Sequence, residues 1–465
     1  MRSYTKTVLL LSIFILGLMI SANAQEESEI VDVSSYQDEA QKIIDAALAD
    51  EEAFQKLTYF VDKYGHRLSG SETLENSIDW ILKEMQEQPF DNVTSQKVMV
   101  PHWVRDEESA TLVSPYKRDL PMLGLGGSVG TLENGVEAEV LVVENFKDLK
   151  KKAEQAKGKI IVYNVPFTSY GETVQYRYRG AVEAAKVGAV ASLIRSVTPF
   201  SMQTPHTGNS AYEEGIKKIP QAAITVEHAK LLHRLQKMGK SIKIHLSMDA
   251  KILPDAPSRN IIAEIKGSEK PEEIVVLGGH IDAWDVGQGA MDDAGGCFAA
   301  WEAVMLMKEL GLKPKRTIRV VMWTNEENGL RGATAYRDMV KENGNLKNHV
   351  LAIESDGGVF EPRGFGFGGT DKGYEIVSKI GTLLVPIGAD TVNRGGGGAD
   401  IGPIMREGVP GMGLLVDHSR YFWYHHTAAD TIDKLDEEEY QKCIATMAIM
   451  AYVAADLPQR IPFGN

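Results

Sequence analysis

Apolar residues in the N-terminal part of this chain recur with the spacing of amphipathic helices. Between residues 36 and 63 they follow one another at intervals typical of a helix with one buried face: Ile43, Ile44, Ala47, Phe54, Leu57, Phe60 and Val61. A second helix is predicted from Ser71 to about Met85, because serine is a favoured N-cap and the acidic Glu72 and Glu75 suit a helix N-terminus. A strand, Thr94–Val100, is predicted next.

After residue 255, short apolar runs alternate with helical stretches. The runs are rich in Val, Ile and Leu and predict buried strands: Asn260–Ile265, Ile274–Leu277, Thr317–Thr324, Val350–Glu354 and Met412–Val416. Helical spacing predicts helices between and after them: Ala294–Leu310, Ala333–Lys341 and Glu437 to about Leu457. This alternation predicts an α/β fold, with a mostly parallel mixed sheet and helices on both faces.

From residue 112 to residue 255 the pattern changes to short strand-like runs separated by Gly and Pro. These runs are Val140–Val143, Lys159–Tyr163, Ala191–Ile194 and Ala222–Thr225. One helix is predicted, Val182–Val187, and no run carries a cluster of ligand-type residues. We predict that residues 112–255 are a β-rich domain inserted into a main domain made of residues 25–111 and 256–465. The alternative is that these strands extend the sheet of the main domain.

The first 24 residues have the organisation of an export signal. Arg2 and Lys6 precede an apolar run from Val8 to Ile20, and Ala22-Asn23-Ala24 then matches a small-residue cleavage site. The run is shorter than the roughly 20 residues that a membrane-spanning helix needs. We therefore predict a signal peptide over residues 1–24, no membrane anchor after its cleavage, and a secreted or periplasmic protein.

The cysteine content and the net charge bear on disulfide formation and on nucleic-acid binding. Cys297 and Cys443 both fall in apolar helical patterns, which favours two buried thiols over a disulfide between them. The formal net charge is −14, and the sequence contains nothing that resembles a basic patch. The negative net charge argues against nucleic-acid binding, and its main effect is on solubility.

A histidine and several aspartates follow the predicted strand Ile274–Leu277. Two glycines separate this strand from His280, and Asp282 can accept the second ring N–H of that imidazole and so select its tautomer. Asp292 and Asp293 come 12 and 13 residues after the histidine, just before the next predicted helix. Because α/β sheets bind ligands at the carboxyl ends of their strands, this arrangement predicts a metal site. If His280 is considered without the rest of the chain, a hydrogen-bonded core histidine beside solvated acids is a better interpretation than a metal ligand.

The next strands of the predicted sheet are also followed by ligand-type residues: Glu326-Glu327, then Asp356, then His425-His426. Strand ends at one sheet edge are neighbours in space, so we expect these side chains to lie near His280. Imidazoles and carboxylates without thiolates suit Zn²⁺ with an open coordination position. Five or six ligands exceed what one zinc ion needs, and they indicate two ions bridged by a carboxylate, roughly 3.5–4 Å apart.

Adjacent glutamates at a strand end can serve two purposes. Successive side chains of an extended segment point in opposite directions, so one of Glu326 and Glu327 can bind metal while the other faces the activated water. A glutamate beside such a water in a dry pocket is a suitable general base. A solvated acidic turn is the alternative, which the surrounding ligand-type residues disfavour.

In this order, the motifs resemble those of the co-catalytic dizinc exopeptidases, a family that includes bacterial leucyl aminopeptidases and glutamate carboxypeptidases. That family shows H-x-D, G-A-x-D-D-x-x-G, E-E, a later Asp and H-x-x-x-D-T. This chain has His280-Ile281-Asp282, Gly289 to Gly296, Glu326-Glu327, Asp356 and His426 to Thr431. YGHRLSGS at residues 64–71 and FWYHHTAADT at residues 422–431 extend the resemblance over nearly all of the chain after the signal peptide.

The resemblance implies a role for each of these residues. The implied metal ligands are His280 and Asp356 on one zinc ion, Glu327 and His426 on the other, and Asp292 on both. The implied catalytic residues are Glu326, as general base, and Asp282, which orients His280. Two zinc ions would activate water for the hydrolysis of short peptides, most of all dipeptides.

The resemblance also implies a cis peptide bond between Asp292 and Asp293 and a protease-associated domain for the inserted segment. Two positions depart from the family. Gly295 stands where a serine is usual, and His425 stands where some relatives carry a tyrosine that stabilises the oxyanion. The residue that stabilises the oxyanion in this chain is therefore left open.

Four further residues are candidates for substrate contacts. Arg394, beside the run Gly395–Gly398, can pair with a substrate carboxylate. The loop around the second metal-ligand histidine offers the others: Tyr421, Trp423 and His425. An aromatic loop of this kind is equally compatible with plain packing.

Alternative functions within this fold are an aminopeptidase for longer peptides, a one-zinc acyltransferase of the glutaminyl cyclase type, and a catalytically dead binding ectodomain. Dead scaffolds lose metal ligands, whereas this chain keeps all five together with the base. A matched set for two metals disfavours the one-zinc enzyme. The sequence leaves the choice between amino- and carboxypeptidase activity open, and it is compatible with a homodimer.

Overall fold

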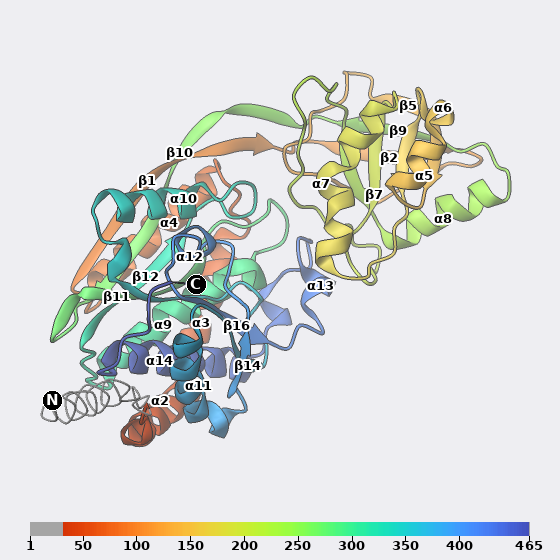
Figure 1. The fold of residues 1–465 in the computed structure, drawn as a ribbon. Coiled ribbons are helices and arrows are strands. Elements are labelled where there is room, and N and C mark those ends of the chain that lie inside the picture. The colour runs from red at the N-terminus through yellow and green to blue at the C-terminus, as the bar shows by residue number, and fades with distance from the viewer. Residues whose placement is uncertain (1–30, 465) are drawn as a thin grey trace, which may run out of the picture.

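A computed structural model describes residues 31–464, so the predicted signal peptide lies outside the described residues. Two eight-stranded sheets form the centres of two units (Figure 1). The units are connected by two long antiparallel strands, β1 (Asn92–Val104) and β10 (Lys251–Ile265), which extend from one unit to the other. A search of the described helices finds none with the length and apolar character needed to cross a membrane.

The main sheet has the strand order β1-β10-β12-β11-β13-β16-β14-β15. Its four central strands run parallel to one another: β12 (Arg316–Trp323), β11 (Lys270–His280), β13 (His349–Glu354) and β16 (Gly411–Val416). The outer strands include antiparallel pairs and complete a mixed sheet: β1, β10, β14 (Pro362–Gly368) and β15 (Thr391–Arg394). The carboxyl ends of the four central strands therefore meet at one edge.

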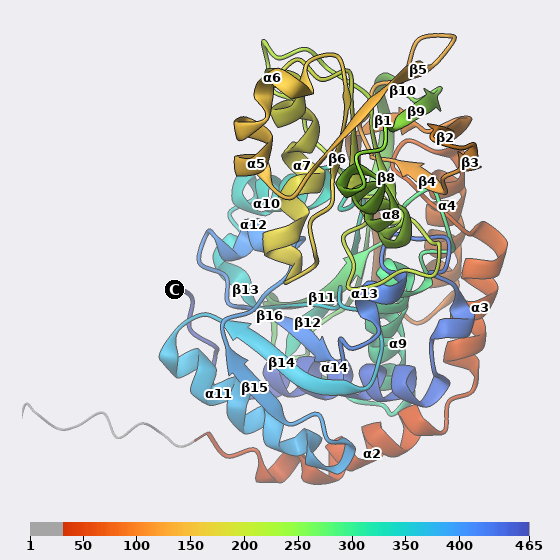
Figure 2. The ribbon, with the colours of Figure 1, turned by 90° about the vertical axis from the view of Figure 1, so that its right-hand side faces the viewer.

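Helices cover both faces of the main sheet (Figures 1 and 2). The apolar core on one face is formed with α2 (Gln37–Leu48), α3 (Glu52–Tyr64), α4 (Glu72–Glu87), α9 (Gly295–Glu309), α11 (Asp371–Gly381) and α14 (Glu437–Asp456). A smaller core on the other face is formed with α10 (Arg331–Glu342) and α12 (Gly402–Met405). The predicted mixed α/β fold with helices on both faces is confirmed.

Local signals explain where the predicted N-terminal elements begin and end. The single helical stretch predicted over residues 36–63 is two helices, because the carboxylate of Asp50 accepts hydrogen bonds from the backbone N–H of Glu52 and Ala53 and starts α3. Ser71 caps α4 as predicted, and its hydroxyl accepts the N–H of Leu74 at 3.2 Å. Strand β1 continues beyond Pro101, where its register with β10 shifts.

The second sheet has the order β3-β2-β9-β5-β6-β7-β8-β4. Its strands are β2 (Glu108–Ser114), β3 (Arg118–Asp119), β4 (Met122–Gly124), β5 (Val136–Val143), β6 (Ile160–Tyr163), β7 (Ala191–Arg195), β8 (Gln221–Ile224) and β9 (Lys243–Met248). They form a sheet of their own rather than an extension of the main sheet. The domain boundaries at residues 112 and 255 stay predictions.

The inserted segment contains more helix than the sequence analysis predicted. Its helices are α5 (Phe146–Lys151), α6 (Ala153–Ala156), α7 (Tyr170–Lys186) and α8 (Val226–Lys237). The predicted helix Val182–Val187 corresponds to the C-terminal part of α7, which begins at Tyr170, where the side chain of Ser169 caps it, and ends at Lys186. The segment is therefore a mixed unit, in which the predicted strands belong to an eight-stranded sheet and helices accompany them. The part of α7 before Val182 was not predicted, because its first turns carry polar and aromatic residues instead of an apolar stripe.

Both cysteines are free and buried, as the sequence analysis favoured. Cys297 lies in α9 and Cys443 in α14, within the larger core of the main unit. Among the elements of the main unit that were not predicted are β14, β15, α11 and α12. Strand β14, PRGFGFG, contains three glycines, which weaken a strand prediction.

Candidate active site

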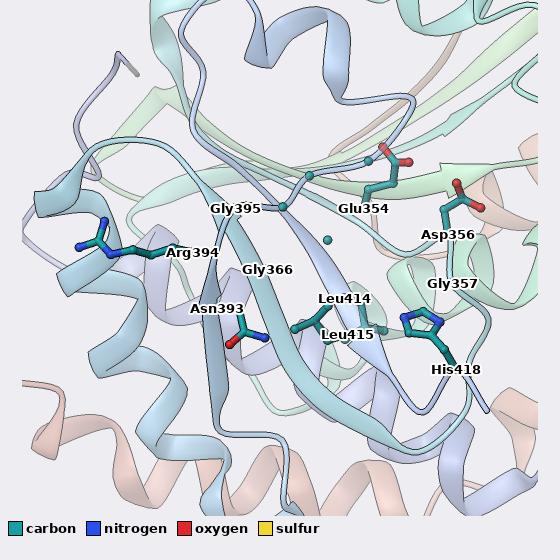
Figure 3. A pocket seen from close by; sticks show the side chains of 14 residues that line it. Glu354, Asp356, Gly357, Gly366, Asn393, Arg394, Gly395, Leu414, Leu415 and His418 are labelled. Carbon is teal, nitrogen blue, oxygen red and sulfur yellow. The ribbon is translucent and has the colours of Figure 1, made fainter. Parts of the chain in front are cut away.

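The predicted ligand residues converge at the carboxyl edge of the main sheet. His280 is the last residue of β11, Glu326 and Glu327 follow β12, and Asp356 follows β13, where its side chain lies near that of Glu354 (Figure 3). The loop after β16 carries the short helix α13 (Tyr421–Tyr424) and then His425 and His426. The parallel pairing of the four central strands is what brings these distant segments together.

Asp292 lies between two imidazole groups. Its Oδ1 is 3.2 Å from Nε2 of His280, which is also 3.3 Å from Oδ1 of Asp356. Its Oδ2 is 3.4 Å from Nε2 of His426, which is also 3.1 Å from Oε2 of Glu327. Each oxygen of this carboxylate therefore faces a different histidine–carboxylate pair. Asp292 and Asp293 are joined by a cis peptide bond, as the resemblance implied.

The donor set fits zinc. Ligand atoms of His280, Asp292 and Glu327 lie within 4.8 Å of one another, and so do those of Asp292, His425 and His426 and those of His280, Asp293 and Asp356. Within residues 31–464, Oδ2 of Asp292 and Oε1 of Glu327 are buried without a hydrogen-bond partner. Buried charged oxygens are normally paired or bind a cation. These residues together are hard and borderline donors of the kind zinc prefers.

Hydrogen bonds orient both histidines for metal binding. Nδ1 of His280 lies 2.9 Å from the backbone carbonyl oxygen of Asp282, and Nδ1 of His426 lies 3.3 Å from that of Thr207. A carbonyl can only accept, so Nδ1 of His280 carries the proton and leaves Nε2 free as a ligand. Nδ1 of His426 lies near both the Thr207 carbonyl, an acceptor, and a guanidinium nitrogen of Arg177, a donor, at 3.2 Å. Contacts with Asp292 and Asp356 outweigh burial and raise the pKa of His280 well above its usual value, whereas burial lowers the pKa of His426.

Asp282 has a different geometry from the one predicted. Its carboxylate Oδ1 is 3.9 Å from Nδ1 of His280, and the acceptor for the ring N–H is its backbone carbonyl instead. The carboxylate accepts the backbone N–H of Glu326 at 3.0 Å and of Glu327 at 3.3 Å. Asp282 therefore connects His280 to the turn that carries both glutamates.

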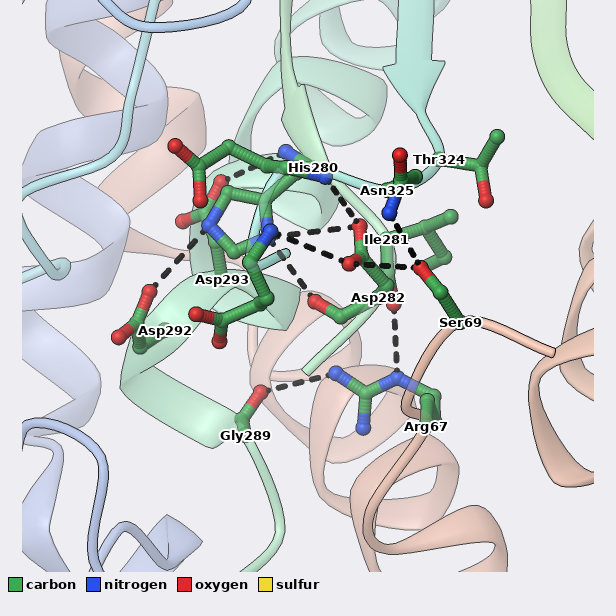
Figure 4. A network of polar contacts seen from close by, with 12 residues as sticks. Arg67, Ser69, His280, Ile281, Asp282, Gly289, Asp292, Asp293, Thr324 and Asn325 are labelled. Atoms are coloured by element: carbon green, nitrogen blue, oxygen red, sulfur yellow. Dashed lines mark hydrogen bonds and ion pairs between the residues drawn. The ribbon is translucent and has the colours of Figure 1, made fainter. Parts of the chain in front are cut away.

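Arg67 and Ser69 of the YGHRLSGS segment contact the residues that follow His280 (Figure 4). The fully buried Arg67 donates to the backbone carbonyls of Ile281 and Gly289, both of which follow the end of β11. The hydroxyl of Ser69 donates to Asp282 at 3.3 Å and accepts from Asn325 at 3.1 Å. This motif therefore has a structural function that the sequence analysis did not assign.

Two more aspartates act on the backbone around Asp292. Asp430, from the H-x-x-x-D-T motif, accepts the N–H of Met291 at 2.8 Å and of Asp292 at 3.2 Å. Asp293 accepts the N–H of His280 at 3.1 Å and of Gly296 at 3.2 Å. Both carboxylate oxygens of Asp293 therefore accept backbone hydrogen bonds. Although Asp293 lies close to His280, these bonds favour a structural role for it over metal binding.

A pocket of about 390 Å³ opens over these residues, and Glu326 lines it with Asp292, Glu327 and Asp356. Burial raises the pKa of Glu326 to about 8, and neighbouring carboxylates add to this rise while His280 opposes it. Glu326 therefore has the environment of a carboxylate that can take up a proton near neutral pH.

The inserted segment forms one wall of this pocket. Tyr170 and Arg177 of α7 line it, and the ring of Tyr170 stacks on Phe422 with a centroid distance of 5.4 Å. The loop before β8 also reaches the main unit, where the N–H of Thr207 donates to the carbonyl of His426 at 3.0 Å. In Figure 1 the lower end of α7 accordingly lies close to α13.

Sequence analysis missed Arg177, which is 6 % exposed. One Nη donates to the hydroxyl of Tyr170 at 2.8 Å, and the other lies 3.2 Å from Nδ1 of His426 and 3.3 Å from the carbonyl of Thr207. Its Nε has no partner among the described residues. No motif marks this arginine, and about 250 residues separate it from the histidine beside it, so only the fold could reveal it.

The candidate substrate contacts fall into two groups. Tyr421 and His425 line the pocket, and Nε2 of His425 is 3.7 Å from Oδ2 of Asp292. Trp423 lies outside this pocket, half-exposed against Phe200. Arg394 points away from Asp356 and pairs with Asp371 at the start of α11 (Figure 3). Arg394 lines a neighbouring pocket that Asp356 also lines, so neither Arg394 nor Trp423 lines the pocket over the metal-ligand residues.

Known proteins share both the sequence and the architecture. Residues 260–451 match the model of peptidase family M28. Carboxypeptidase Q of Xenopus laevis is 47% identical over 98% of this chain and 99% of its own. A peptidase M28 precursor from Shewanella amazonensis is similar in structure, with a TM-score of 0.88, 33% identity, and coverage of 93% of this chain and 99% of that one.

A zinc aminopeptidase of Bacillus subtilis shares the fold, with a TM-score of 0.66 at 23% identity over 88% of this chain and 96% of that one. A carboxylate–imidazole site at the edge of an α/β sheet, together with these likenesses, defines a zinc-dependent metallopeptidase. The chain belongs to peptidase family M28.

Proposed function

We propose that this protein is an exported exopeptidase that hydrolyses dipeptides with two zinc ions. The observation that carries the proposal is the position of Asp292, whose two oxygens face two separate histidine–carboxylate pairs. One zinc ion would be held by His280 and Asp356, the other by Glu327 and His426, and Asp292 would bridge them. Zinc bound there would polarise the scissile carbonyl and lower the pKa of the attacking water toward ~7.

Glu326 would act as the general base. It lines the pocket beside the ligand residues but belongs to neither histidine–carboxylate pair, so its carboxylate is available for proton transfer. It would accept the proton of the attacking water and deliver it to the nitrogen of the leaving amine. Asp282 holds the backbone of the turn and thereby the position of this carboxylate.

Arg177 is our candidate for the group that binds the substrate carboxylate, in place of Arg394. It is the cationic side chain that lines the pocket among the described residues, and its Nε is unpaired. Guanidinium groups bind carboxylates through paired N–H donors. Carboxypeptidase Q, a relative by sequence, is named for cleavage at the carboxyl end, which agrees with a free carboxylate in the substrate.

Hydrolysis of dipeptides with free ends, N-acetylated dipeptides and dipeptide amides tests this proposal. The wild-type protein is expected to cleave dipeptides with a free carboxylate best. Arg177→Met should lower kcat/KM for these by about 10- to 100-fold, because a charge-assisted pair is lost, and should change cleavage of the amides little. Arg179→Met is the matched control, since Arg179 lies on the same helix but is exposed and paired with Glu183.

Equal loss on free dipeptides and on amides would contradict the role of Arg177. A wild-type protein that cleaves long peptides and ignores dipeptides would instead favour the alternative of an aminopeptidase for longer chains.

His426→Ala should lose zinc and activity, whereas His425→Ala should retain both metal ions. Nε2 of His426 lies 3.1 Å from Glu327, and its Nδ1 faces a carbonyl acceptor. Nε2 of His425 is farther from Asp292, at 3.7 Å, and the two rings stack at 3.6 Å. Metal analysis of both purified variants checks this; loss of zinc from His425→Ala with full retention in His426→Ala would reverse the assignment.

The remaining sequence predictions are proposals of the same kind. We propose that residues 112–255 form a protease-associated domain, which is supported by the separate sheet in this segment. We also propose that residues 1–24 direct export, which is supported by their charge and apolar pattern. Analysis of the N-terminus of the protein after expression in its host would test the cleavage near Gln25.

A further inference from the structure

A second pocket, of about 460 Å³, adjoins the catalytic pocket at Asp356, which lines both. The run Gly395–Gly398 forms one side of it, and Leu414 and Leu415 of β16 provide an apolar surface (Figure 3). Its size is within the range of small-molecule sites. A group bound here would lie directly beside the proposed zinc site.

Glu354 is an unusual residue to find lining this pocket. It is 1 % exposed, and its Oε2 accepts the N–H of Ile401 at 2.7 Å, while its Oε1 has no partner within the described part of the chain. Residues two apart in an extended chain project to the same side, and the side chains of Glu354 and Asp356 lie near each other in Figure 3. A buried carboxylate oxygen without a partner is unfavourable unless a cationic group pairs with it.

The glycine run packs closely against this carboxylate. A Cβ atom at Gly398 would lie 2.0 Å from Cδ of Glu354 and 2.2 Å from its Oε1, a distance that no side chain could occupy. Asp400, just beyond the run, is buried as well and has two oxygens without partners in the described residues. Asp400 does not line the pocket, whose own carboxyl groups are those of Glu354 and Asp356. Arg394 does not neutralise them, since its guanidinium is paired with Asp371.

The geometry favours an ammonium group over a metal ion. None of the candidate metal clusters among residues 31–464 includes Glu354 or Asp400. An ammonium group needs only hydrogen-bond acceptors, and it arrives attached to carbon atoms that can contact Leu414 and Leu415. The α-amino group of a peptide is largely protonated at neutral pH.

We propose that Glu354 binds the α-ammonium group of the peptide substrate and that this pocket holds its N-terminal residue. The inference rests on the proposed peptidase function and extends it. Glu354 would bind the amino end of a dipeptide, on the side of the site away from Arg177. Recognition at both ends would restrict the substrate to short peptides with free termini.

The test compares free and N-acetylated dipeptides in wild type and Glu354→Gln. Glutamine can still accept the N–H of Ile401 but carries no charge. The variant is expected to retain its zinc and its melting temperature, and to lose about 10- to 100-fold in kcat/KM on free dipeptides with little change on N-acetylated ones. Asp390→Asn, which removes an exposed carboxylate just before β15, is the matched control and should change neither.

Binding of leucinol and of N-acetylleucinol to the zinc-loaded protein, measured by calorimetry, provides a readout that does not depend on turnover. Glu354→Gln should weaken leucinol binding by a similar factor and leave N-acetylleucinol unaffected. The proposal is overturned if both compounds are affected equally, if neither is affected, or if the variant loses zinc. If the wild-type protein binds leucinol more tightly than Glu354→Gln does but cleaves no dipeptide, the proposed function is refuted while the ammonium site is supported.

Discussion

Glu326→Gln is expected to lower kcat by about 10²–10⁴-fold, the usual contribution of a positioned general base. The amide cannot take up the proton of the attacking water, although it has nearly the same shape as the carboxylate. Zinc content and folding should be unchanged, because neither histidine–carboxylate pair around Asp292 includes Glu326. Steady-state kinetics together with elemental analysis of the purified variant check both halves of this expectation.

The neighbouring glutamate is the matched control. Glu327→Gln makes the same chemical change one residue away, but it weakens a proposed metal ligand 3.1 Å from His426. This variant should therefore lose zinc as well as activity. A Glu326→Gln protein with near-normal kcat would refute the assignment of the base, and a Glu326→Gln protein without zinc would mean that the two glutamates have exchanged roles.

Removal of zinc by a chelator is expected to abolish hydrolysis, and added Zn²⁺ should restore it. Elemental analysis of the active protein should find close to two zinc ions per chain. The metal-free protein should also melt at a lower temperature, because the carboxylates of Asp292, Glu327 and Asp356 are then left together without the cations that offset their repulsion.

A fully active sample with one tightly bound zinc ion would contradict the two-metal proposal. Full activity after complete removal of metal would exclude zinc catalysis altogether. A metal that binds without affecting the melting temperature would show that the buried carboxylates are neutralised by protons instead.

The inserted segment contacts the candidate active site, although none of its strands carries a cluster of ligand-type residues. Arg105, at the end of β1, forms a paired ion contact with Asp285 of the main unit at 2.6 and 2.7 Å. It also donates to the hydroxyl of Thr207 at 3.2 Å, in the loop whose carbonyl faces His426. Arg105 therefore connects Asp285 to the Thr207 loop of the inserted segment, and this segment contributes both to the pocket wall and to the contacts of one histidine.

The sequence by itself determined the α/β order of the main unit and the set of metal-ligand candidates. Buried parallel strands appear as short continuous apolar runs, and His280, Glu326, Glu327 and Asp356 each come within three residues of the end of such a run. The position of a residue just after a strand is a local property, and parallel pairing then fixes which strand ends share an edge. These features therefore needed no coordinates.

Only the tertiary structure decided which partners these residues have. The acceptor for His280 is the backbone carbonyl of Asp282 and not its carboxylate, a choice made by strand geometry. Neither Arg177 nor Glu354 belongs to a motif. Arg177 approaches the site through packing of the inserted unit, and Glu354 lies against Gly398, which is 44 residues away in the sequence. Contacts of this kind depend on long-range packing, which spacing along the chain does not encode.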